Sequence, residues 1–261
     1  MPPLFTAVGP FTVRTFTLAL ALGFAACAGL AFVYAPRKGL RRSAVIDACI
    51  AALAGAVIGA RLEFVLLNWD YFVDNLNEAL RLQSGGLSWH GAVIGGLIGL
   101  FIVAKLRKLP AADLLDMLTP APALLMLSGW YACWSANGAC GYGIEVDTLA
   151  RYPMYTVSEA PDIYGIIAPR YNTQMFGVAL AIVLLALAAV LLWRGWLPYR
   201  RFWLLLALAS VATFFVGFWR GDPSPLISGL RLDQWLDTAI LVFTLVIMAV
   251  RSRQRNMVSY Y

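Results

Sequence analysis

Long, uninterrupted apolar runs constrain this chain more than any other feature. The runs are apolar all round rather than along one stripe, and each is close to the length that a helix needs to cross a bilayer, about 20 residues. Only helices and closed barrels satisfy all backbone hydrogen bonds in hydrocarbon. The sequence therefore predicts an all-α, polytopic membrane protein with about seven transmembrane helices. We place these near residues 12–34, 44–67, 87–104, 112–134, 173–193, 202–219 and 233–250.

Composition supports a membrane protein and excludes an ordinary soluble domain. Hydrophobic residues make up 61% of the 261 residues and charged residues only 13%, whereas a soluble domain carries about a quarter charged residues. The net charge of +6 belongs to the loops, so we expect no nucleic-acid partner. The fourth run is the least regular, because Asp113 and Asp116 stand at its start and Pro120 and Pro122 lie inside it.

The distribution of charge predicts how the bundle is oriented. Basic residues concentrate in the loops on the cytoplasmic side of bacterial membrane proteins. One set of connections carries most of the arginines and every lysine: Arg37, Lys38, Arg41, Arg42, Lys105, Arg107, Lys108, Arg194, Arg200, Arg201, Arg251, Arg253 and Arg255. The opposite set carries most of the acids: Asp70, Asp74, Glu78, Glu145, Asp147, Glu159, Asp162 and Asp222. We predict that the N-terminus is outside and the C-terminus cytoplasmic.

The longest polar segment, residues 135–171, falls on the predicted outer side. It is too short to hold a core of its own, so we expect residues 1–261 to form a single integral-membrane domain with 135–171 as a small extracytoplasmic lid. Its prolines and glycines favour a loop. Cys133 and Cys140 flank its start, where an oxidising compartment permits a disulfide, although spacing alone does not establish one.

Small residues predict how two of the spans pack. Gly55 and Gly59 recur at a spacing of four in the second span, as do Gly91, Gly95 and Gly99 in the third. Such spacing lets helix backbones approach closely in lipid. It brings Arg61 and Glu63, at the end of the second span, near His90. Cys27 and Cys49 read as small core residues, and no Cys/His cluster has metal-ligand spacing, so we expect no metal or cofactor.

His90 is the only histidine of the chain, and it stands where a span begins. A histidine takes up and returns a proton near neutral pH, but one at a helix end also serves to cap a turn or to meet interfacial water. For Arg61 and Arg220, too, both a functional and a structural role fit the sequence. Either arginine suits a lipid phosphate, and either suits an ion pair or an anchor at the membrane interface. Together the three side chains indicate a site for an anionic lipid head group.

Two motifs resemble those of the prolipoprotein diacylglyceryl transferase family. The stretch from Gly59 to Leu66 reads Gly-Ala-Arg-Leu-Glu-Phe-Val-Leu, similar to the family's Gly-Gly-Arg-x-x-Tyr. The stretch from Gly85 to Gly91 reads Gly-Gly-Leu-Ser-Trp-His-Gly, similar to its Gly-Gly-Met/Leu-Ser-Phe/Tyr-His-Gly-Gly. Weaker similarities lie at 133–143, 172–176, 214–220 and Gln234.

The resemblance implies a transferase in the bacterial cytoplasmic (inner) membrane, acting at the outer leaflet. It implies two substrates: phosphatidylglycerol or another anionic phospholipid, and the lipobox peptide of a preprolipoprotein. It also implies site residues. His90 is the expected catalytic base, and the expected substrate-binding residues are Arg61, Arg220, Asn137, Gly138, Ser88 and Gln174.

The sequence departs from the family pattern at two arginines. Trp130 follows Gly129 where the family has Gly-Arg, and Thr213 stands at the first arginine of the motif in the sixth span. An alternative function is therefore a catalytically silent relative that binds anionic lipid or lipopeptide as an accessory protein. A small-molecule transporter is a third possibility, but the absence of an internal repeat counts against it.

Overall fold

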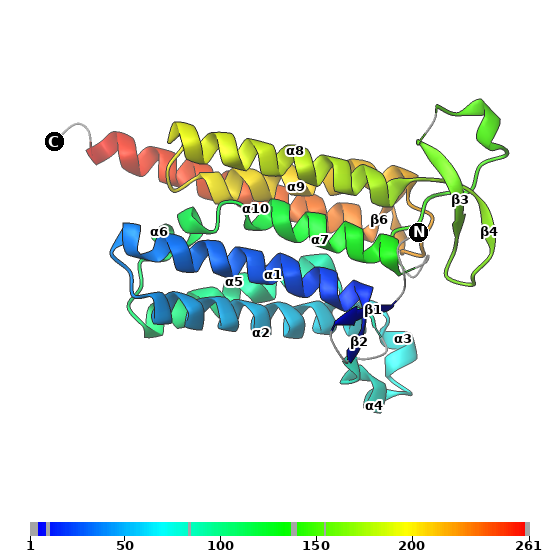
Figure 1. The fold of residues 1–261 in the computed structure, drawn as a ribbon, viewed down its shortest axis with the longest axis horizontal. Coiled ribbons are helices and arrows are strands. Elements are labelled where there is room, and N and C mark those ends of the chain that lie inside the picture. Colours follow the sequence, from blue (N-terminus) through cyan, green and yellow to red (C-terminus); the bar gives the residue numbers. More distant parts are fainter. Residues whose placement is uncertain (1–4, 9–10, 83–84, 137–139, 154, 259–261) are drawn as a thin grey trace. The chain divides into compact units, whose positions relative to one another are not determined.

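The structure is a computed structural model that describes residues 5–8, 11–82, 85–136, 140–153 and 155–258, and most of these residues are helical (Figure 1). Six helices in the described part of the chain are long and apolar enough to cross a membrane. They run over Thr15–Lys38, Arg42–Leu67, Trp89–Leu106, Thr173–Arg194, Arg201–Trp219 and Leu232–Ser252. The prediction of an all-α, polytopic membrane protein is confirmed.

The fourth predicted span is not one continuous helix. It consists of two helices, α6 (Ala111–Met117) and α7 (Ala121–Ser135), which count as a seventh span only if the bent pair is taken together. Proline lacks the amide hydrogen that a helix interior needs, but it is tolerated at a helix start. Pro120 is the residue before α7, and Pro122 lies in its first turn, so a new helix begins where the continuous one was predicted.

The chain divides into two compact units. The larger unit comprises Met1–Cys27 and Thr119–Tyr261, and the smaller unit comprises Ala28–Leu118.

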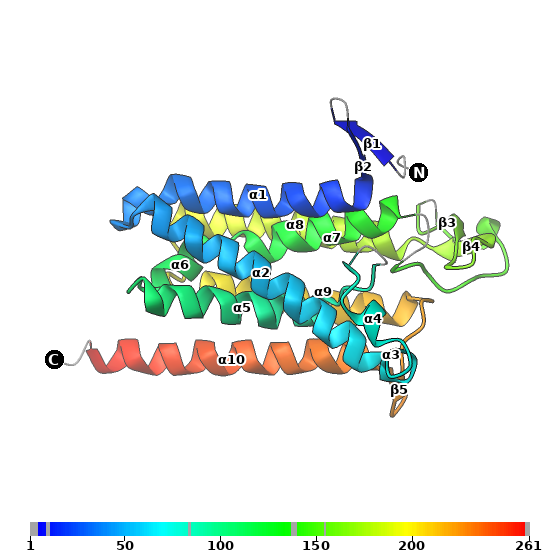
Figure 2. The ribbon, with the colours of Figure 1, turned by 90° about the horizontal axis from the view of Figure 1, so that it is seen from below.

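The smaller unit is built on α2 (Arg42–Leu67) and α5 (Trp89–Leu106), which lie side by side (Figure 2). Gly55 lies against the carbonyl group of Gly95, and Gly59 against that of Gly91, so the predicted glycine interface is confirmed. The chain enters α2 through η1 (Ala35–Lys38), and α3 (Trp69–Phe72) and α4 (Leu76–Ala79) connect α2 to α5.

Ion pairs hold the other end of this unit together. Lys38 Nζ lies 3.2 Å from Asp113 Oδ1 and 3.0 Å from Asp116 Oδ2. Arg107 Nη2 lies 2.6 Å from Asp47 Oδ2. The two acids that made the fourth run irregular are therefore partners of a lysine from the loop after the first span.

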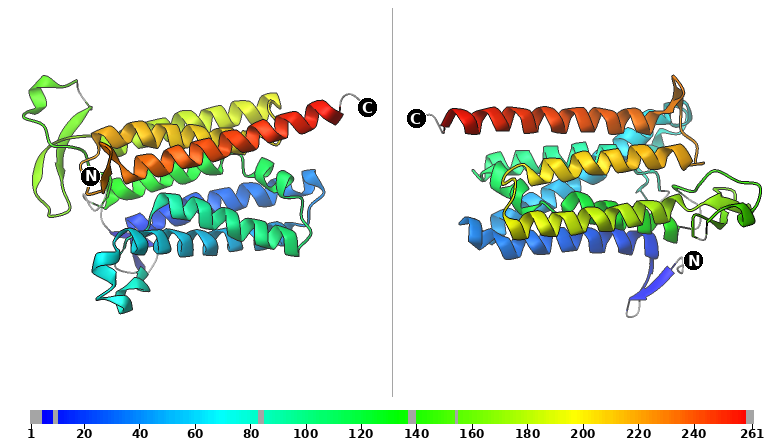
Figure 3. Two further views of the ribbon diagram at one scale, coloured as in Figure 1. Left: turned by 180° about the vertical axis from the view of Figure 1, so that it is seen from behind. Right: turned by 90° about the horizontal axis from the view of Figure 1, so that it is seen from above.

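The larger unit contains most of α1 (Thr15–Tyr34) and the helices α7, α8 (Thr173–Arg194), α9 (Arg201–Val216) and α10 (Leu232–Val258). Helix α7 packs on α8, α8 on α9 and α9 on α10, as Figure 3 shows from two sides. Their core includes Met126, Trp130, Leu184 and Leu205. The expectation that Cys27 and Cys49 are core residues is confirmed, since both are buried, Cys27 in this unit and Cys49 in the smaller one.

The polar segment after α7 is more regular than predicted. A disulfide joins Cys133 and Cys140 at its start, and η3 (Leu149–Arg151) and an antiparallel hairpin of β3 (Val157–Pro161) and β4 (Ile167–Tyr171) follow. The prediction of a loop is wrong for this hairpin. Pro169 pairs with Glu159 in it, because both strands of a two-stranded sheet are edges, where proline is tolerated.

Two smaller hairpins were also not predicted. Strands β1 (Phe5–Val8) and β2 (Phe11–Arg14) precede α1, so α1 begins at Thr15 rather than near residue 12. Strands β5 (Leu226–Ile227) and β6 (Leu230–Arg231) lie between α9 and α10. The second of these hairpins carries part of the site described next.

Candidate functional site

His90 lies in the first turn of α5, where its side chain is buried with a relative exposure of 6% for the residue. Glu63 of α2 faces it. The Nδ1 atom of His90 lies 3.6 Å from Glu63 Oε1, and Glu63 Oε2 accepts a hydrogen bond from the backbone N–H of Gly91. We call His90, Glu63 and Gly91 the His90 cluster. The carboxylate stands at the N-terminal end of α5, the end of a helix that favours negative charge.

Ser88 precedes this helix as its N-cap residue, but its hydroxyl does not cap the helix. Its backbone N–H donates to the carbonyl oxygen of Ala60 at 3.1 Å. The carboxylate of Glu63 therefore does on α5 what a capping side chain usually does, since it accepts from a free N–H of the first turn.

Arg61 stands two residues before Glu63 on α2, with an exposure of only 7%. Its guanidinium donates to the backbone carbonyl oxygens of Glu78 (2.6 Å), Ala79 (2.7 Å), Gly85 and Gly86 (3.1 Å). The rings of Phe64 and Phe72 lie 5.6 and 5.3 Å from its central carbon. Among the described residues these bonds end on backbone carbonyls rather than on acids, so Arg61 holds residues 78, 79, 85 and 86 onto α2.

Arg220 follows η4 (Gly217–Trp219), the short helix after α9 in the larger unit. It belongs to a group of two arginines and two aspartates joined by ion pairs. Its Nε and Nη2 atoms donate to the two carboxylate oxygens of Asp222, and its Nη1 donates to Asp233 Oδ2 at 2.7 Å. Arg231 of β6 donates from Nε to Asp233 Oδ1 at 3.1 Å and from Nη1 to the carbonyl oxygen of Asp222 at 2.8 Å. We call Arg220, Asp222, Arg231 and Asp233 the Arg220 cluster.

Burial and the neighbouring carboxylates shift the pKa of Arg220 in opposite directions. Burial by itself lowers the pKa of Arg220, but the negative charges of Asp222, Asp233 and Asp237 outweigh it, so the net effect raises the pKa above its ordinary value. The arginine therefore keeps its charge at every working pH. Close paired carboxylates of this kind favour a charged guanidinium.

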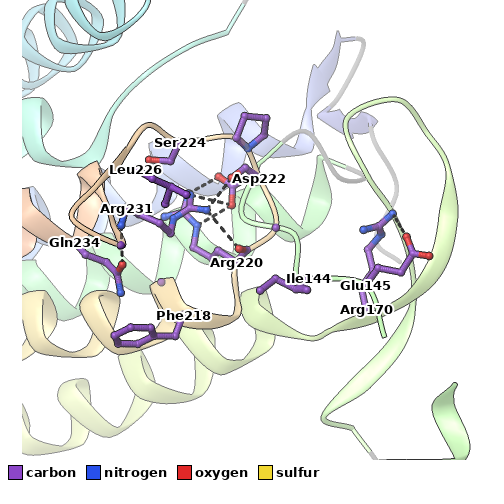
Figure 4. Close-up of a pocket in the computed structure, with 14 residues that line it drawn as sticks. Ile144, Glu145, Arg170, Phe218, Arg220, Asp222, Ser224, Leu226, Arg231 and Gln234 are labelled. Carbon is purple, nitrogen blue, oxygen red and sulfur yellow. Dashed lines mark hydrogen bonds and ion pairs between the residues drawn. The ribbon is translucent and has the colours of Figure 1, made fainter. Parts of the chain in front are cut away.

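The cluster borders a pocket of about 510 Å³ (Figure 4). Figure 4 shows Arg220, Asp222 and Arg231 together on one side, and Glu145 and Arg170 apart from them. Arg170 lies 3.2 Å from Glu145 and 3.3 Å from Asp162 through its Nη2 atom. Ser224 and Gln234 also line the pocket. The pocket is thus lined by three guanidinium groups, and each of them is already paired with a carboxylate.

Sequence reasoning missed Arg231 and Arg170 as members of this pocket. Both arginines lie in the connections that carry most of the acids, and this position was the available signal, shared with Arg81 and Arg151. It was not specific, because the pairing depends on the β5–β6 hairpin and on the backbone bridges that join Gly143 to Arg220 and Glu145 to Arg170.

Trp130 and Thr213, at which the sequence motifs predict the loss of two family arginines, both make structural contacts. The Trp130 ring packs against Gly141 and Gly177 and lies 5.9 Å from the guanidinium carbon of Arg220. The Thr213 hydroxyl donates to Asp237 Oδ1 of α10 at 2.7 Å. Neither position supplies a cation, so the guanidinium groups of this unit's pocket come from loops and strands instead.

Gln174 of α8 holds the disulfide loop. Its Nε2 donates to the carbonyl oxygens of Cys133 (3.3 Å) and Cys140 (2.7 Å), and the neighbouring Thr173 hydroxyl donates to that of Gly141 at 2.6 Å. Asn137 and Gly138, two predicted substrate-binding residues, lie outside the described residues.

Comparison with known proteins identifies the relatives of this chain. A model of the prolipoprotein diacylglyceryl transferase family matches residues 2–250. The phosphatidylglycerol–prolipoprotein diacylglyceryl transferase of Streptococcus mutans serotype c is 27% identical over 269 residues, which cover 99% of this chain and 98% of that protein. The enzyme of the same name from Streptococcus pneumoniae is 27% identical over 271 residues, covering 100% and 97%.

Proposed function

The chain belongs to the prolipoprotein diacylglyceryl transferase family, a family of transferases, and from this premise we propose the reaction that it catalyses. It transfers the diacylglyceryl group of phosphatidylglycerol to the thiol of the lipobox cysteine in a preprolipoprotein. The names of the relatives, matched along nearly the whole chain, support both the lipid and the protein substrate.

The reaction exchanges one bond for another. The cysteine sulfur attacks the terminal carbon of the diacylglyceryl group, a C–S bond forms, and the C–O bond to phosphate breaks. Glycerol 1-phosphate leaves and gains the negative charge that the thiolate loses. His90 takes the thiol proton, because a thiol with an ordinary pKa of about 8.5 is mostly protonated at neutral pH and attacks only as thiolate.

The strongest support for this proposal is that Arg220 and Arg231 line the same pocket. A leaving phosphate needs fixed donors that gain strength as its charge grows. Arginine presents such donors in a planar fork that matches phosphate oxygens. We propose that this pocket binds the phosphate of the lipid, with Arg231 supplying the second guanidinium that Trp130 and Thr213 do not.

The test is transfer by purified protein in vesicles that contain phosphatidylglycerol, with a synthetic lipobox peptide as acceptor. We expect a thioether-linked diacylglyceryl peptide by mass spectrometry. Removing one donor from such a site costs about 100-fold, so Arg220→Gln and Arg231→Gln should each lower kcat/KM by about that factor. Arg151→Gln is the matched control, because Arg151 is an exposed arginine of the same unit whose ion pair is with Asp147.

Loss of all transfer in His90→Gln, with a melting temperature near that of the wild type, would support its role as base. If folded wild-type protein forms no thioether under conditions in which the Streptococcus pneumoniae enzyme does, the proposed reaction is wrong.

A specific observation favours a second candidate, the silent accessory protein. Arg220 and Arg231 are already matched by Asp222 and Asp233, and Trp130 and Thr213 replace two expected arginines. This alternative gives vesicle binding that depends on phosphatidylglycerol and weakens in Arg220→Gln, but no thioether product. The same assay therefore separates the two candidates.

We further propose that residues 135–171 form an extracytoplasmic lid, that the N-terminus is outside and that the site faces the outer leaflet. The concentration of lysine and arginine in the opposite loops supports this orientation. In intact cells, a membrane-impermeant maleimide should label Tyr164→Cys in the exposed loop between β3 and β4. It should label Lys108→Cys only after permeabilisation. The reverse pattern would overturn the orientation.

A further inference from the structure

We propose that Glu63 is a positioning residue, which holds the proton of the neutral His90 imidazole on Nδ1 and thereby places the lone pair on Nε2. This inference rests on the proposed role of His90 as base. It assigns to Glu63 a task in the reaction that is separate from its contact with the helix backbone.

The two oxygens of the Glu63 carboxylate have different surroundings. Oε2 accepts the backbone N–H of Gly91. Oε1 is buried, and among the described residues it has no hydrogen-bond partner, while His90 Nδ1 lies 3.6 Å from it. A buried carboxylate oxygen left without a donor is costly. A donor on Nδ1 is the group in reach that removes this cost, after a movement of a few tenths of an ångström.

The helix interface fixes this arrangement. Gly59 and Gly91 lie backbone to backbone, and a Cβ atom at position 91 would collide with the Glu63 side chain as well as with the carbonyl group of Gly59. The space for the carboxylate therefore exists because residue 91 is glycine. With one oxygen held by the Gly91 N–H, the other has little freedom to turn away from His90.

The nearest guanidinium does not compete for this carboxylate. Arg61 stands two residues before Glu63 on α2, but its hydrogen bonds run to the carbonyl oxygens of residues 78, 79, 85 and 86. The negative charge of Glu63 is thus left to face the imidazole. At this end of α2, Arg61 binds the connection before α5 and Glu63 binds the first turn of α5.

The chemistry follows from the donors and acceptors involved. In a neutral imidazole one nitrogen is a donor and the other an acceptor, and the hydrogen bond made by one determines the tautomer. An ionised carboxylate only accepts. Facing Glu63, Nδ1 must be the donor, so Nε2 is the acceptor that takes a proton from a thiol. Once His90 is protonated, the same carboxylate stabilises the imidazolium.

Nuclear magnetic resonance tests this directly, because His90 is the only histidine. Protein labelled with ¹⁵N-histidine gives signals from one imidazole, and their shifts report which nitrogen carries the proton. We expect the Nδ1–H tautomer to dominate in the wild type. In Glu63→Gln the side-chain carbonyl still accepts from Gly91, which turns the amide NH2 toward Nδ1 and moves the proton to Nε2. Asp70→Asn, at an exposed acid of the same unit, should leave the tautomer unchanged.

Activity supplies the second measurement. Glu63→Gln should lower kcat at least about tenfold and leave the KM for phosphatidylglycerol within about twofold, as expected for a group that acts through the base. Adding Glu63→Gln to His90→Gln should cause no further loss. A merely structural role predicts instead that kcat and the melting temperature fall while the tautomer stays the same.

The outcomes distinguish this inference from the proposed function. If the wild type shows the Nε2–H tautomer, or if Glu63→Gln leaves the tautomer unchanged, the positioning role is wrong whatever the protein catalyses. If the tautomer moves as expected but no variant or wild-type protein transfers lipid, the geometry holds and the reaction fails. Glu63→Asp keeps the charge, so it should retain the wild-type tautomer and covers the case in which Glu63→Gln does not fold.

Discussion

The guanidinium of Arg220 lies over the ring of Trp130, with its central carbon 5.9 Å from the ring centroid. The resemblance seen in the sequence places a family arginine at Trp130. In the structure this position carries an aromatic face that supports the cation of Arg220. Because the same ring fills the space beside Gly141 and Gly177, its position is fixed on three sides.

Trp130→Ala should remove this support. The ring is almost fully buried in the helix core of the larger unit, and loss of a buried tryptophan side chain costs about 3–5 kcal/mol. We expect a clear fall in melting temperature in detergent, together with weaker binding of phosphatidylglycerol vesicles. Trp130→Phe keeps a ring and should lose less. Trp193→Ala, at a residue of α8 that is 79% exposed, is the control, and an equal effect there would contradict the assignment.

Alanine substitutions at two neighbouring glycines of α5, Gly95 and Gly96, should differ sharply in their effect on stability. A Cβ atom at Gly95 would collide with the carbonyl group of Gly55, whereas one at Gly96 would meet Ala52 and Ala56 at 3.4 and 3.5 Å, which is ordinary contact. Gly95→Ala should therefore separate α2 from α5 and cost about 1–3 kcal/mol, the usual range for overpacking. Gly96→Ala should leave the melting temperature nearly unchanged. Equal effects would mean that the helices do not approach through Gly95.

The disulfide between Cys133 and Cys140 can be counted chemically. Alkylation of the denatured protein should modify two thiols before reduction, those of Cys27 and Cys49, and four after it. Closing a short loop of this length stabilises a protein by about 2–3 kcal/mol in the chain-entropy model. Cys133→Ser with Cys140→Ser should lower the melting temperature accordingly. Four reactive thiols in the unreduced wild type would show that the bond does not form.

Stability at alkaline pH should depend on Tyr142. Burial raises the pKa of Tyr142 above its ordinary value, the carboxylates of Asp222 and Asp162 raise it further, and Arg170 opposes them. The folded protein thus prefers the neutral phenol. This contribution to stability is complete below about pH 10, the ordinary pKa of tyrosine, and is lost as the pH rises through the raised value.

Melting temperatures measured from pH 8 to pH 11 test this prediction. The wild type should lose more stability over the range than Tyr142→Phe. The exposed Tyr155 gives the control, and Tyr155→Phe should follow the wild type. A parallel decline of all three proteins would assign the alkaline loss to other groups.

The parts of the fold that depend on local pattern could be read from the sequence. Hydropathy located the spans to within a few residues, because each must match the thickness of a bilayer. Glycine spacing predicted that Glu63 approaches His90, because residues four apart share one face of a helix, and the close contact of Gly59 with Gly91 sets the register of the two helices.

The parts that depend on loop geometry could not be read in this way. Arg231 reaches the carbonyl oxygen of Asp222 because the two-residue strands β5 and β6 turn the chain back, and no apolar periodicity marks such short strands. The sequence suits Arg61 to a phosphate or to an acid, but its hydrogen-bond partners are backbone carbonyls, which every residue carries and no sequence pattern distinguishes.

The hydrogen bonds from Arg61 to backbone carbonyls determine which substitutions and insertions the connection between α2 and α5 tolerates. Because the guanidinium contacts the main chain of residues 78 and 79 and not their side chains, these two side chains can be exchanged without losing its hydrogen bonds. Gly85 and Gly86 are different, since both have a positive φ that other residues rarely adopt. The length of the connection cannot change freely either, since one inserted residue would move the carbonyl oxygens out of reach. Positions 78 and 79 are therefore suited to carry new side chains at a constant loop length, as a place to vary what the loop presents while α2 and α5 stay as they are.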